Sequence, residues 1–291
     1  MRLATFDDDR VGVVTETGVV DVSDLIDRPF DGPIAAAPGA SRMRRLAAAP
    51  ALLARIRHEL PARRPRPLAE VTLQAPLPDP GKIVAAPVNY QDHKAEMRLK
   101  GDINAMGFFL KAPTSVLGPG GQVRLPYTNR RIDHEAEFAV VIGAPARHVG
   151  PDEALGHVFG YTGLIDVTMR GGEERSMRKS FDTFTPVGPW IVTPDELGDP
   201  SDVGFTLWTN GTVRQKSNTA ELIWDVARFV AFASTVTTLL PGDVISTGTP
   251  AGVSPLADGD TVTLEIDRIG RLTVTVTADG AVPCPLTPGD A

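Results

Sequence analysis

The sequence contains little cysteine and no long apolar run. Cys284 is the one cysteine among 291 residues, so no intrachain disulfide can form, and a zinc site built from cysteines is excluded. No stretch approaches the roughly 18 apolar residues of a membrane helix, and charged residues near the start leave no apolar run for a signal peptide. We therefore expect a soluble protein of the reducing cytoplasm without a membrane partner.

Positive charge is scarce relative to negative charge. Lys and Arg number 29 against 36 Asp and Glu, and the net charge of −7 disfavours a nucleic-acid partner, whose phosphates would be repelled. Hydrophobic residues make up 42% of the chain, enough for a sizeable core in one or two domains. The 28 glycines and 26 prolines favour turns over long helices, so we expect a fold that is rich in strands.

Residue patterns predict many short strands, three helices and one domain boundary. Six prolines between residues 61 and 80 stiffen the chain, which places the boundary near residue 72, between domains 1–72 and 73–291. The predicted helices are 41–60 with Ser41 as N-cap, 90–100 closed by Gly101, and 219–240 with Thr219 as N-cap. The predicted strands are 2–6, 11–14, 19–22, 83–86, 107–110, 123–125, 135–142, 160–167, 190–192, 204–209, 244–246 and 261–266.

Two acidic side chains share one face of a predicted strand. Strand alternation places Glu135 and Glu137 on the same, otherwise apolar face, where they would repel each other unless a cation lay between them. Hard oxygen ligands at this spacing suit Mg²⁺, Mn²⁺ or Ca²⁺, and Asp166, at the end of another predicted strand, is a candidate third ligand. The alternative is a strand edge at which both glutamates reach water.

A histidine and a lysine are further candidates for chemistry. His93 and Glu96 lie three residues apart on a predicted helix, so the carboxylate can orient the imidazole to take a proton from water. The alternative is a surface charge pair. Lys179 precedes an aromatic segment, where it could hold an anionic substrate, or it could simply be solvated. We interpret the other four histidines as structural or solvated: His58, His134, His148 and His157.

Taken together, these segments resemble the fumarylacetoacetate hydrolase family, in order, from about residue 82 to 270. The matching runs are KIVAAPVNYQDHKAE (82–96), FFLKAPTSVLGPG (108–120), DHEAEFAVVIG (133–143), GYTGLIDVTMR (160–170), KSFDTFTPVGPWIVT (179–193), NGTVRQKSNT (210–219) and LLPGDVISTGTPAGV (239–253). The resemblance implies an α+β, β-rich fold: a mixed β-roll catalytic domain over 73–291, preceded by a small N-terminal β/α domain over 1–72.

The resemblance also implies a set of functional residues. It places a divalent metal, usually Mg²⁺, on Glu135, Glu137 and Asp166, in agreement with the strand-face interpretation. The implied roles of the remaining residues are water activation by His93 and Glu96, substrate holding by Lys179, and further substrate contacts by Lys111, Arg170 and Thr249. Members of the family are commonly homodimers that act on 2-oxo or 2,4-dioxo acids.

The resemblance and the residues together predict an acylpyruvate hydrolase. A metal chelated by the carboxylate and 2-oxo oxygen of the substrate can stabilise the enolate that forms when the carbon–carbon bond breaks. Decarboxylation of a β-oxo acid such as oxaloacetate, or isomerisation of a hydroxymuconate-type diacid, would start from the same enolate, and both remain open. A non-catalytic binding module is the third alternative.

Three positions depart from the pattern common in the family. Pro87 stands where many members have Gly, and Ile165 stands where Asn often precedes the ligand Asp. Glu173 falls where members often carry Gln. Its added negative charge is expected either to repel an anionic substrate tail or to engage one of three nearby arginines, Arg170, Arg175 or Arg178.

Overall fold

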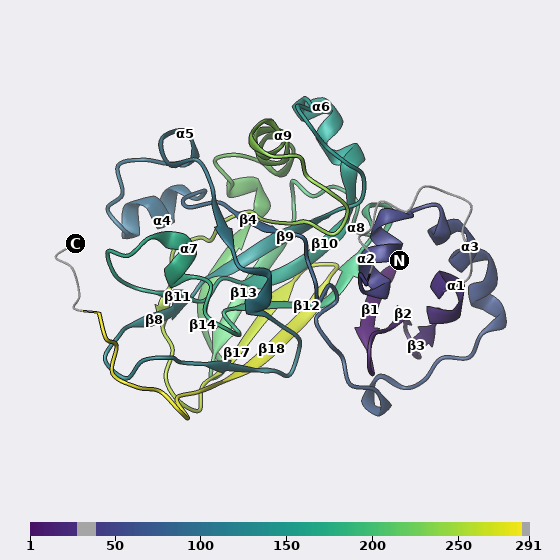
Figure 1. Ribbon diagram of the computed structural model, residues 1–291, viewed down its shortest axis with the longest axis horizontal. Coiled ribbons are helices and arrows are strands. Elements are labelled where there is room, and N and C mark those ends of the chain that lie inside the picture. The colour runs from purple at the N-terminus through teal and green to yellow at the C-terminus, as the bar shows by residue number, and fades with distance from the viewer. Residues whose placement is uncertain (28–38, 287–291) are drawn as a thin grey trace.

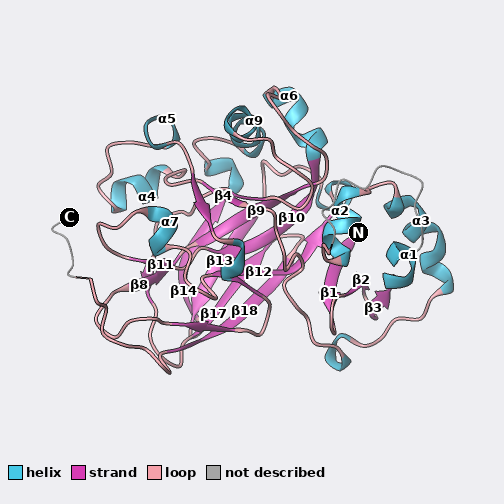
Figure 2. Cartoon of the chain, in the orientation of Figure 1, coloured by secondary structure: helices cyan, strands magenta, loops and turns pink. Residues whose placement is uncertain are grey.

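The structure of the protein is a computed structural model that describes residues 1–27 and 39–286. Figure 1 shows a strand-rich body with a smaller N-terminal part at one side. Figure 2 shows that the helices are short and lie outside the strands. The expectation of an α+β, β-rich fold is confirmed by this arrangement.

Ten strands form the largest sheet, which runs from the N-terminal part into the body. Its order is β3 (Gly18–Asp21), β2 (Arg10–Thr15), β1 (Arg2–Phe6), β12 (Thr185–Val192), β10 (Val158–Ile165), β9 (Ala136–Ile142), β15 (Val244–Ser246), β4 (Ile83–Ala85) and β5 (Phe109–Lys111), with β6 (Val116–Leu117) paired to β12. β1 and β12 are antiparallel, with Leu3 opposite Ile191. The division near residue 72 therefore lies beside a sheet that spans both sides of it, and it remains a prediction.

Two smaller sheets complete the β-structure. The five-stranded sheet has the order β14 (Thr212–Asn218), β13 (Gly204–Thr209), β17 (Thr261–Ile266), β18 (Gly270–Thr277) and β7 (Gln122–Arg124). The three-stranded sheet has the order β11 (Thr168–Met169), β8 (Ile132–His134) and β16 (Ser254–Pro255). Glu135 joins β8 directly to β9, so this glutamate lies where the three-stranded and ten-stranded sheets meet.

The main apolar core lies between the ten-stranded and five-stranded sheets. Phe138 of β9 stacks on Tyr161 of β10 with ring centroids 5.3 Å apart, and the same cluster includes Leu264 of β17 and Leu272 of β18. A fully buried side chain of this size contributes about 2 kcal/mol to folding. Every residue of β9 is buried, because the strand is covered on both faces. β9 is therefore held rigidly in the core, and so are the side chains that project from it.

The helices are short, and they connect the strands. They are α1 (Ser23–Asp27), α2 (Arg42–Ala48), α3 (Leu52–Glu59), α4 (Gln91–Glu96), α5 (Ile103–Met106), α6 (Pro151–Ala154), α7 (Arg175–Arg178), α8 (Pro194–Leu197) and α9 (Val226–Val236). Single 3₁₀ turns span Leu60–Ala62, Leu68–Glu70, Pro113–Ser115, Leu155–His157 and Thr219–Glu221. Over residues 1–27 and 39–286, no helix combines the length and apolar character that crossing a membrane requires.

Each predicted helix is shorter than the sequence pattern indicated. The helix expected over 41–60 is two helices, α2 and α3, separated around Pro50, which has no N–H for a helical hydrogen bond. Ser41 is the N-cap of α2, as predicted, and accepts a hydrogen bond from Arg44 N at 3.2 Å. The helix expected over 90–100 ends at Glu96, because Arg98 adopts a left-handed backbone with φ of 51°.

The helix expected over 219–240 begins late. Residues 219–221 form a 3₁₀ turn, and α9 starts at Val226 with Asp225, not Thr219, as its N-cap. The intervening residues bind to the segment before α4: Ile223 N donates to Asn89 O at 2.9 Å, and Trp224 N donates to Asn89 Oδ1 at 2.8 Å. These tertiary hydrogen bonds hold the chain extended where its composition favours a helix.

The positions of the predicted strands agree with the structure more closely than those of the predicted helices do. Every strand segment expected from the sequence overlaps a strand of the structure, although β12 starts five residues before the expected 190 and Glu135 separates β8 from β9. β14 and β18 were not among the expected strands. β14 is mostly polar, so the apolar pattern that marks a strand is weak there, whereas β18 alternates Leu272, Val274 and Val276 with polar residues and carries that pattern, so its omission from the predicted strands was wrong.

Candidate active site

Three carboxylates from distant parts of the sequence meet at one end of β9 and β10. The two strands are antiparallel, with Leu164 opposite Glu137, and Asp166 follows β10 directly. Asp166 N donates to Glu135 O at 2.8 Å. One ligand oxygen from each of Glu135, Glu137 and Asp166 lies within 4.8 Å of the other two, and all three residues are buried. The alternative of a strand edge that faces water does not hold for the two glutamates.

Buried cations neutralise these carboxylates. Lys179 Nζ donates to Glu135 Oε2 at 2.7 Å and to Asp166 Oδ2 at 2.6 Å. Lys111 Nζ donates to Asp166 Oδ1 and, at 3.0 Å, to the carbonyl of Phe184. Arg170 Nη2 lies 2.8 Å from Glu135 Oε1. The cluster therefore balances buried negative and positive charges, which burial requires.

The two glutamates have opposite electrostatic environments. Burial raises the pKa of Glu137 to about 8, and the negative charge of Asp166 adds to this effect. Burial also acts to raise the pKa of Glu135, but the charges of Lys179 and Arg170 outweigh it, and the pKa is lowered. Glu137 is thus the ligand whose charge is least compensated by the protein.

The donor set fits a divalent metal ion. All three groups are carboxylates, whose hard oxygens are the ligands that Mg²⁺, Mn²⁺ and Ca²⁺ prefer. Glu137 is fixed by hydrogen bonds from Ser246 Oγ and, at 2.8 Å, from Gly248 N to its Oε2. A carboxylate oriented in this way is preorganised for metal binding.

His93 and Glu96 are held together on α4. His93 Nδ1 lies 3.2 Å from Glu96 Oε2, the pairing that their spacing predicted. His93 is 4% exposed while Glu96 is exposed, so the pair joins a buried imidazole to a carboxylate at the surface and is not a pair of two solvated side chains. The other oxygen, Glu96 Oε1, accepts a hydrogen bond from Gly252 N at 3.0 Å. The carboxylate therefore fixes the imidazole ring and ties α4 to the loop before β16.

A cavity of about 330 Å³ connects the carboxylate cluster with His93. Figure 1 shows α4 and α7, which contribute to it, at the same end of the body, away from the N-terminal part. Its lining consists of Pro87, His93, Met97, Leu99, Glu135, Arg170, Gly171, Arg175, Arg178 and Lys179. Two residues predicted as substrate contacts are not in this lining: Lys111 is buried beside Asp166, and Thr249 is buried with its Oγ1 bonded to Gln215 Nε2.

Comparison with known proteins identifies the family. The sequence model described as "Fumarylacetoacetate (FAA) hydrolase C-terminal" matches residues 82–277. The chain belongs to the fumarylacetoacetate hydrolase family. A maleylpyruvate hydrolase from Aquipseudomonas alcaligenes is 42% identical over 289 residues, which cover 95% of this chain and 99% of the relative.

Solved structures of the family agree with this assignment. The crystal structure of a maleylpyruvate hydrolase from Sphingobium sp. SYK-6 has a TM-score of 0.84 and 42% identity, and the match covers 96% of this chain and 100% of that one. A second structure of that hydrolase, in complex with manganese (II) and pyruvate, has a TM-score of 0.83 and 40% identity, with coverage of 96% and 99%. The predictions of this family's fold and of an enzyme that hydrolyses carbon–carbon bonds of acylpyruvate-type acids are confirmed.

The residues that depart from the family pattern occupy three different environments. Pro87 lines the cavity, and Ile165 is buried at the end of β10. Glu173 forms an ion pair with Arg130. The expectation that it would engage Arg170, Arg175 or Arg178 is therefore wrong, because Arg130, which was not considered, lies closer.

The structure adds site residues that the sequence did not reveal. Asp133 Oδ2 accepts from Arg170 Nε at 2.7 Å and so orients the guanidinium toward the cavity. His134 and Gln215 are buried and hydrogen-bonded to each other, with His134 Nδ1 3.1 Å from Gln215 Oε1. Burial lowers the pKa of His134, consistent with its interpretation as a structural histidine. Gln215 lies in a run of polar residues, so no local signal distinguishes it.

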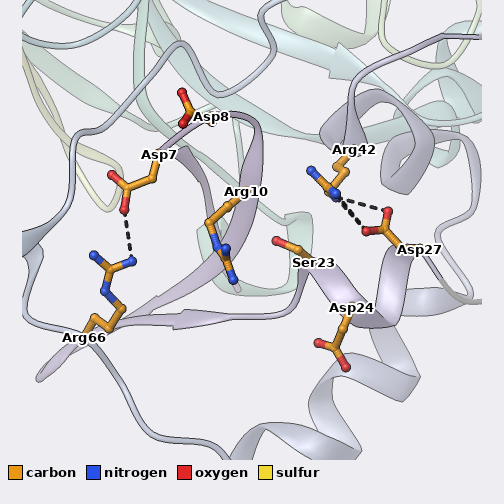
Figure 3. Close-up of a pocket in the computed structure, with 8 residues that line it drawn as sticks. All are labelled: Asp7, Asp8, Arg10, Ser23, Asp24, Asp27, Arg42 and Arg66. Atoms are coloured by element: carbon orange, nitrogen blue, oxygen red, sulfur yellow. Dashed lines mark hydrogen bonds and ion pairs between the residues drawn. The ribbon is translucent and has the colours of Figure 1, made fainter.

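A second cavity, of about 450 Å³, lies in the N-terminal part (Figure 3). It is lined by Asp7, Asp8, Arg10, Ser23, Asp24, Asp27, Arg42 and Arg66. Each arginine in it is paired with a carboxylate: Arg66 with Asp7 at 2.9 Å, Arg42 with Asp27 at 2.8 Å, and Arg10 with Asp21 at 2.6 Å. The chemistry predicted from the sequence lies in the other cavity.

Proposed function

We propose that the protein hydrolyses an acylpyruvate with a second carboxylate at its acyl end, as maleylpyruvate has, and releases pyruvate and a dicarboxylic acid. The observation that carries this proposal is the positive charge of the cavity beside the carboxylate cluster. Arg175 and Arg178 of α7 both line the cavity, and within the described parts of the chain no carboxylate lies within ion-pair distance of either. Such guanidinium groups favour a carboxylate ligand.

The surroundings of these arginines strengthen this proposal. Arg175 Nη2 lies 3.5 Å from Met106 Sδ, and Arg178 Nη1 lies 3.4 Å from the carbonyl of Met169, so neither guanidinium has a charged partner there. Burial lowers the pKa of Arg178, and the positive charge of Arg175 adds to this effect. A substrate carboxylate would relieve both the burial of charge and the repulsion between the two cations.

The carboxylate cluster would receive the pyruvate half. Glu135, Glu137 and Asp166 would hold a divalent ion, for which we propose Mg²⁺, with Mn²⁺ or Ca²⁺ as alternatives. When bound, such an ion supplies positive charge to the carboxylate and 2-oxo oxygens of the substrate. Lys179 lies against this cluster and would offset the negative charge that develops on the pyruvate half as the bond breaks. Of the further contacts that the resemblance implies, Arg170 lines the cavity and would touch the substrate, whereas Lys111 and Thr249 would act from behind the lining, through Asp166 and Gln215 respectively.

His93 would activate water. Its Nδ1 lies beside Glu96 Oε2, and the tautomer with the proton on Nδ1 would leave Nε2 to take a proton from a water molecule in the cavity. The hydroxide attacks the distal carbonyl, the bond between that carbon and the adjacent methylene carbon breaks, and the methylene carbon takes up a proton. The new carboxylic acid and pyruvate then account for all atoms of the substrate and the water.

We also propose that the protein acts as a homodimer in the cytoplasm. Its single cysteine and its net charge of −7 suit a reducing compartment and a small-molecule substrate rather than a nucleic acid. Light scattering of the purified protein would test the dimer.

The decisive experiment compares two substrates that differ at the acyl end, maleylpyruvate and acetylpyruvate, in the presence of Mg²⁺ or Mn²⁺. We expect pyruvate release from maleylpyruvate at the higher kcat/KM, and we expect Arg178→Ala to reduce that preference about tenfold or more, since a charge-assisted hydrogen bond is lost. Release of CO₂ from oxaloacetate, or a spectral shift at conserved mass with a hydroxymuconate, in place of pyruvate release would instead support the decarboxylase or the isomerase.

A further inference from the structure

A single buried amide joins the metal-binding strand to the loop that faces the candidate site. Gln215 is the one buried residue of β14, with 1% exposure, while its neighbours on this edge strand are exposed or half-buried. Burying a primary amide costs free energy unless both of its ends form hydrogen bonds. Both ends of Gln215 do so, and each end serves a different part of the site.

The oxygen end of Gln215 binds the strand that carries the glutamates. Oε1 accepts a hydrogen bond at 2.9 Å from the backbone N of Ala136, the residue between Glu135 and Glu137. The nitrogen end binds the loop at 247–253: Nε2 donates to Thr249 Oγ1 and to the carbonyl of Pro250, both at 2.8 Å. A backbone N–H can only donate and a carbonyl can only accept, so these partners fix the orientation of the amide.

The same loop also reaches the candidate base. Gly252 N donates to Glu96 Oε1 at 3.0 Å, and Glu96 in turn holds His93. The loop lies directly on β14, because a Cβ on Gly252 would come within 2.0 Å of the Arg214 carbonyl, and the φ of Gly252 is +99°. The hydrogen bonds of Gln215 and this close approach together set where the loop lies relative to β9.

We propose that Gln215 is a positioning residue for catalysis: it fixes the distance between the carboxylates on β9 and the loop that carries Thr249 and supports the Glu96–His93 pair. This proposal rests on the proposed function for its effect on turnover, but not for its effect on the loop. Glu137 already binds the loop at Gly248, so Gln215 governs the part beyond it, residues 249–252.

The test is Gln215→Glu, which keeps the shape of the side chain and removes both N–H donors. A carboxylate would face the carbonyl of Pro250, so we expect amide exchange of residues 249–253 to rise about tenfold or more, while that of β9 stays unchanged. We expect kcat/KM to fall about 10- to 100-fold, with Mn²⁺ affinity, measured by electron paramagnetic resonance, within about threefold of the unmodified protein. Gln122→Glu, the same change at an exposed position of β7, is the matched control.

A double variant shows whether Gln215 acts through Thr249. If it does, Thr249→Ala combined with Gln215→Glu should lower kcat/KM by less than the product of the two single effects. The proposal is overturned if loop exchange is unchanged in folded Gln215→Glu, if Mn²⁺ affinity falls as much as kcat/KM, or if the two effects multiply fully. If the unmodified protein turns over no dioxo acid, the proposed function fails, while the exchange measurement still tests the role of Gln215 in the loop.

Discussion

The carboxylate of Glu173 forms an ion pair with the guanidinium of Arg130, a side chain that is 3% exposed. Arg130 also lies 3.5 Å from the carbonyl of Arg170 and 3.7 Å from Cys284 Sγ. The pair therefore anchors the turn after Arg170 to the segment before β8 and to the C-terminal region. It also directs the negative charge of Glu173 toward Arg130 and leaves Arg175 and Arg178 available to a ligand.

This arrangement predicts that Glu173 supports substrate binding. Glu173→Ala should raise KM for a dicarboxylic acylpyruvate a few-fold, because the turn between two cavity arginines loses its anchor, and should leave kcat nearly unchanged. Arg130→Ala should have a similar effect, and the double variant should be no worse than either single one. A lower KM in Glu173→Ala would show instead that this glutamate repels the substrate.

Loss of the imidazole should separate turnover from metal binding. We expect His93→Ala to abolish hydrolysis while Mn²⁺ affinity stays near that of the unmodified protein, since His93 is not one of the three carboxylate ligands. Glu96→Gln should reduce kcat about 10- to 100-fold, because the ring loses its charged partner but stays in place. Steady-state kinetics and Mn²⁺ titration are the two measurements, and equal losses in both would indicate a structural role for His93.

Removal of the metal, or of one ligand charge, should abolish activity without unfolding the protein. Chelator is expected to stop turnover, and added Mg²⁺ or Mn²⁺ should restore it. Glu137→Gln should weaken Mn²⁺ binding more than about tenfold, because the site loses one of three negative charges. Glu16→Gln, an exposed surface change, provides the control. Full activity in a metal-free sample would contradict the proposed centre.

The cap of the longest described helix offers a test of stability. Asp225 Oδ1 accepts from Arg228 N at 2.8 Å at the start of α9. We expect Asp225→Ala to lower the free energy of unfolding by about 1 kcal/mol, and Asp225→Asn, which keeps the acceptor, to cost much less. Denaturant midpoints measure both. Equal midpoints for all three proteins would mean that tertiary packing alone determines where α9 begins.

The sequence predicted the strands and the acidic cluster well, because both depend on local alternation. Strand alternation puts Glu135 and Glu137 on the same side of the chain at β9. Asp166 became a candidate ligand because it lies at the end of a predicted strand, now β10. The helix starts and ends were predicted less well. At Trp224 the chain is held by Asn89, 135 residues earlier, and such a contact leaves no local pattern.

Lys179 was a candidate from its neighbouring residues, and Lys111 and Arg170 from the family resemblance, but neither the contacts that these cations share nor the buried amide could be predicted from local patterns. Lys111 and Lys179 come from separate elements and meet only at Asp166. Gln215 looks like any polar residue of an edge strand, and its burial follows from the loop that folds over it. Predicting the contacts of these residues would require knowing which strands pair with each other, and a single sequence does not contain that information.

The pairing of β1 with β12 has a practical consequence for work with shorter versions of this protein. Arg2 and Leu3 lie opposite Val192 and Ile191, so β1 covers the outer side of β12. A version trimmed to start after residue 72 would leave main-chain N–H and C=O groups of β12 without their partner strand. An unpaired edge strand of this kind promotes aggregation with other molecules. A truncated version should therefore carry either a replacement strand that pairs with β12 or charged substitutions along β12 that oppose aggregation.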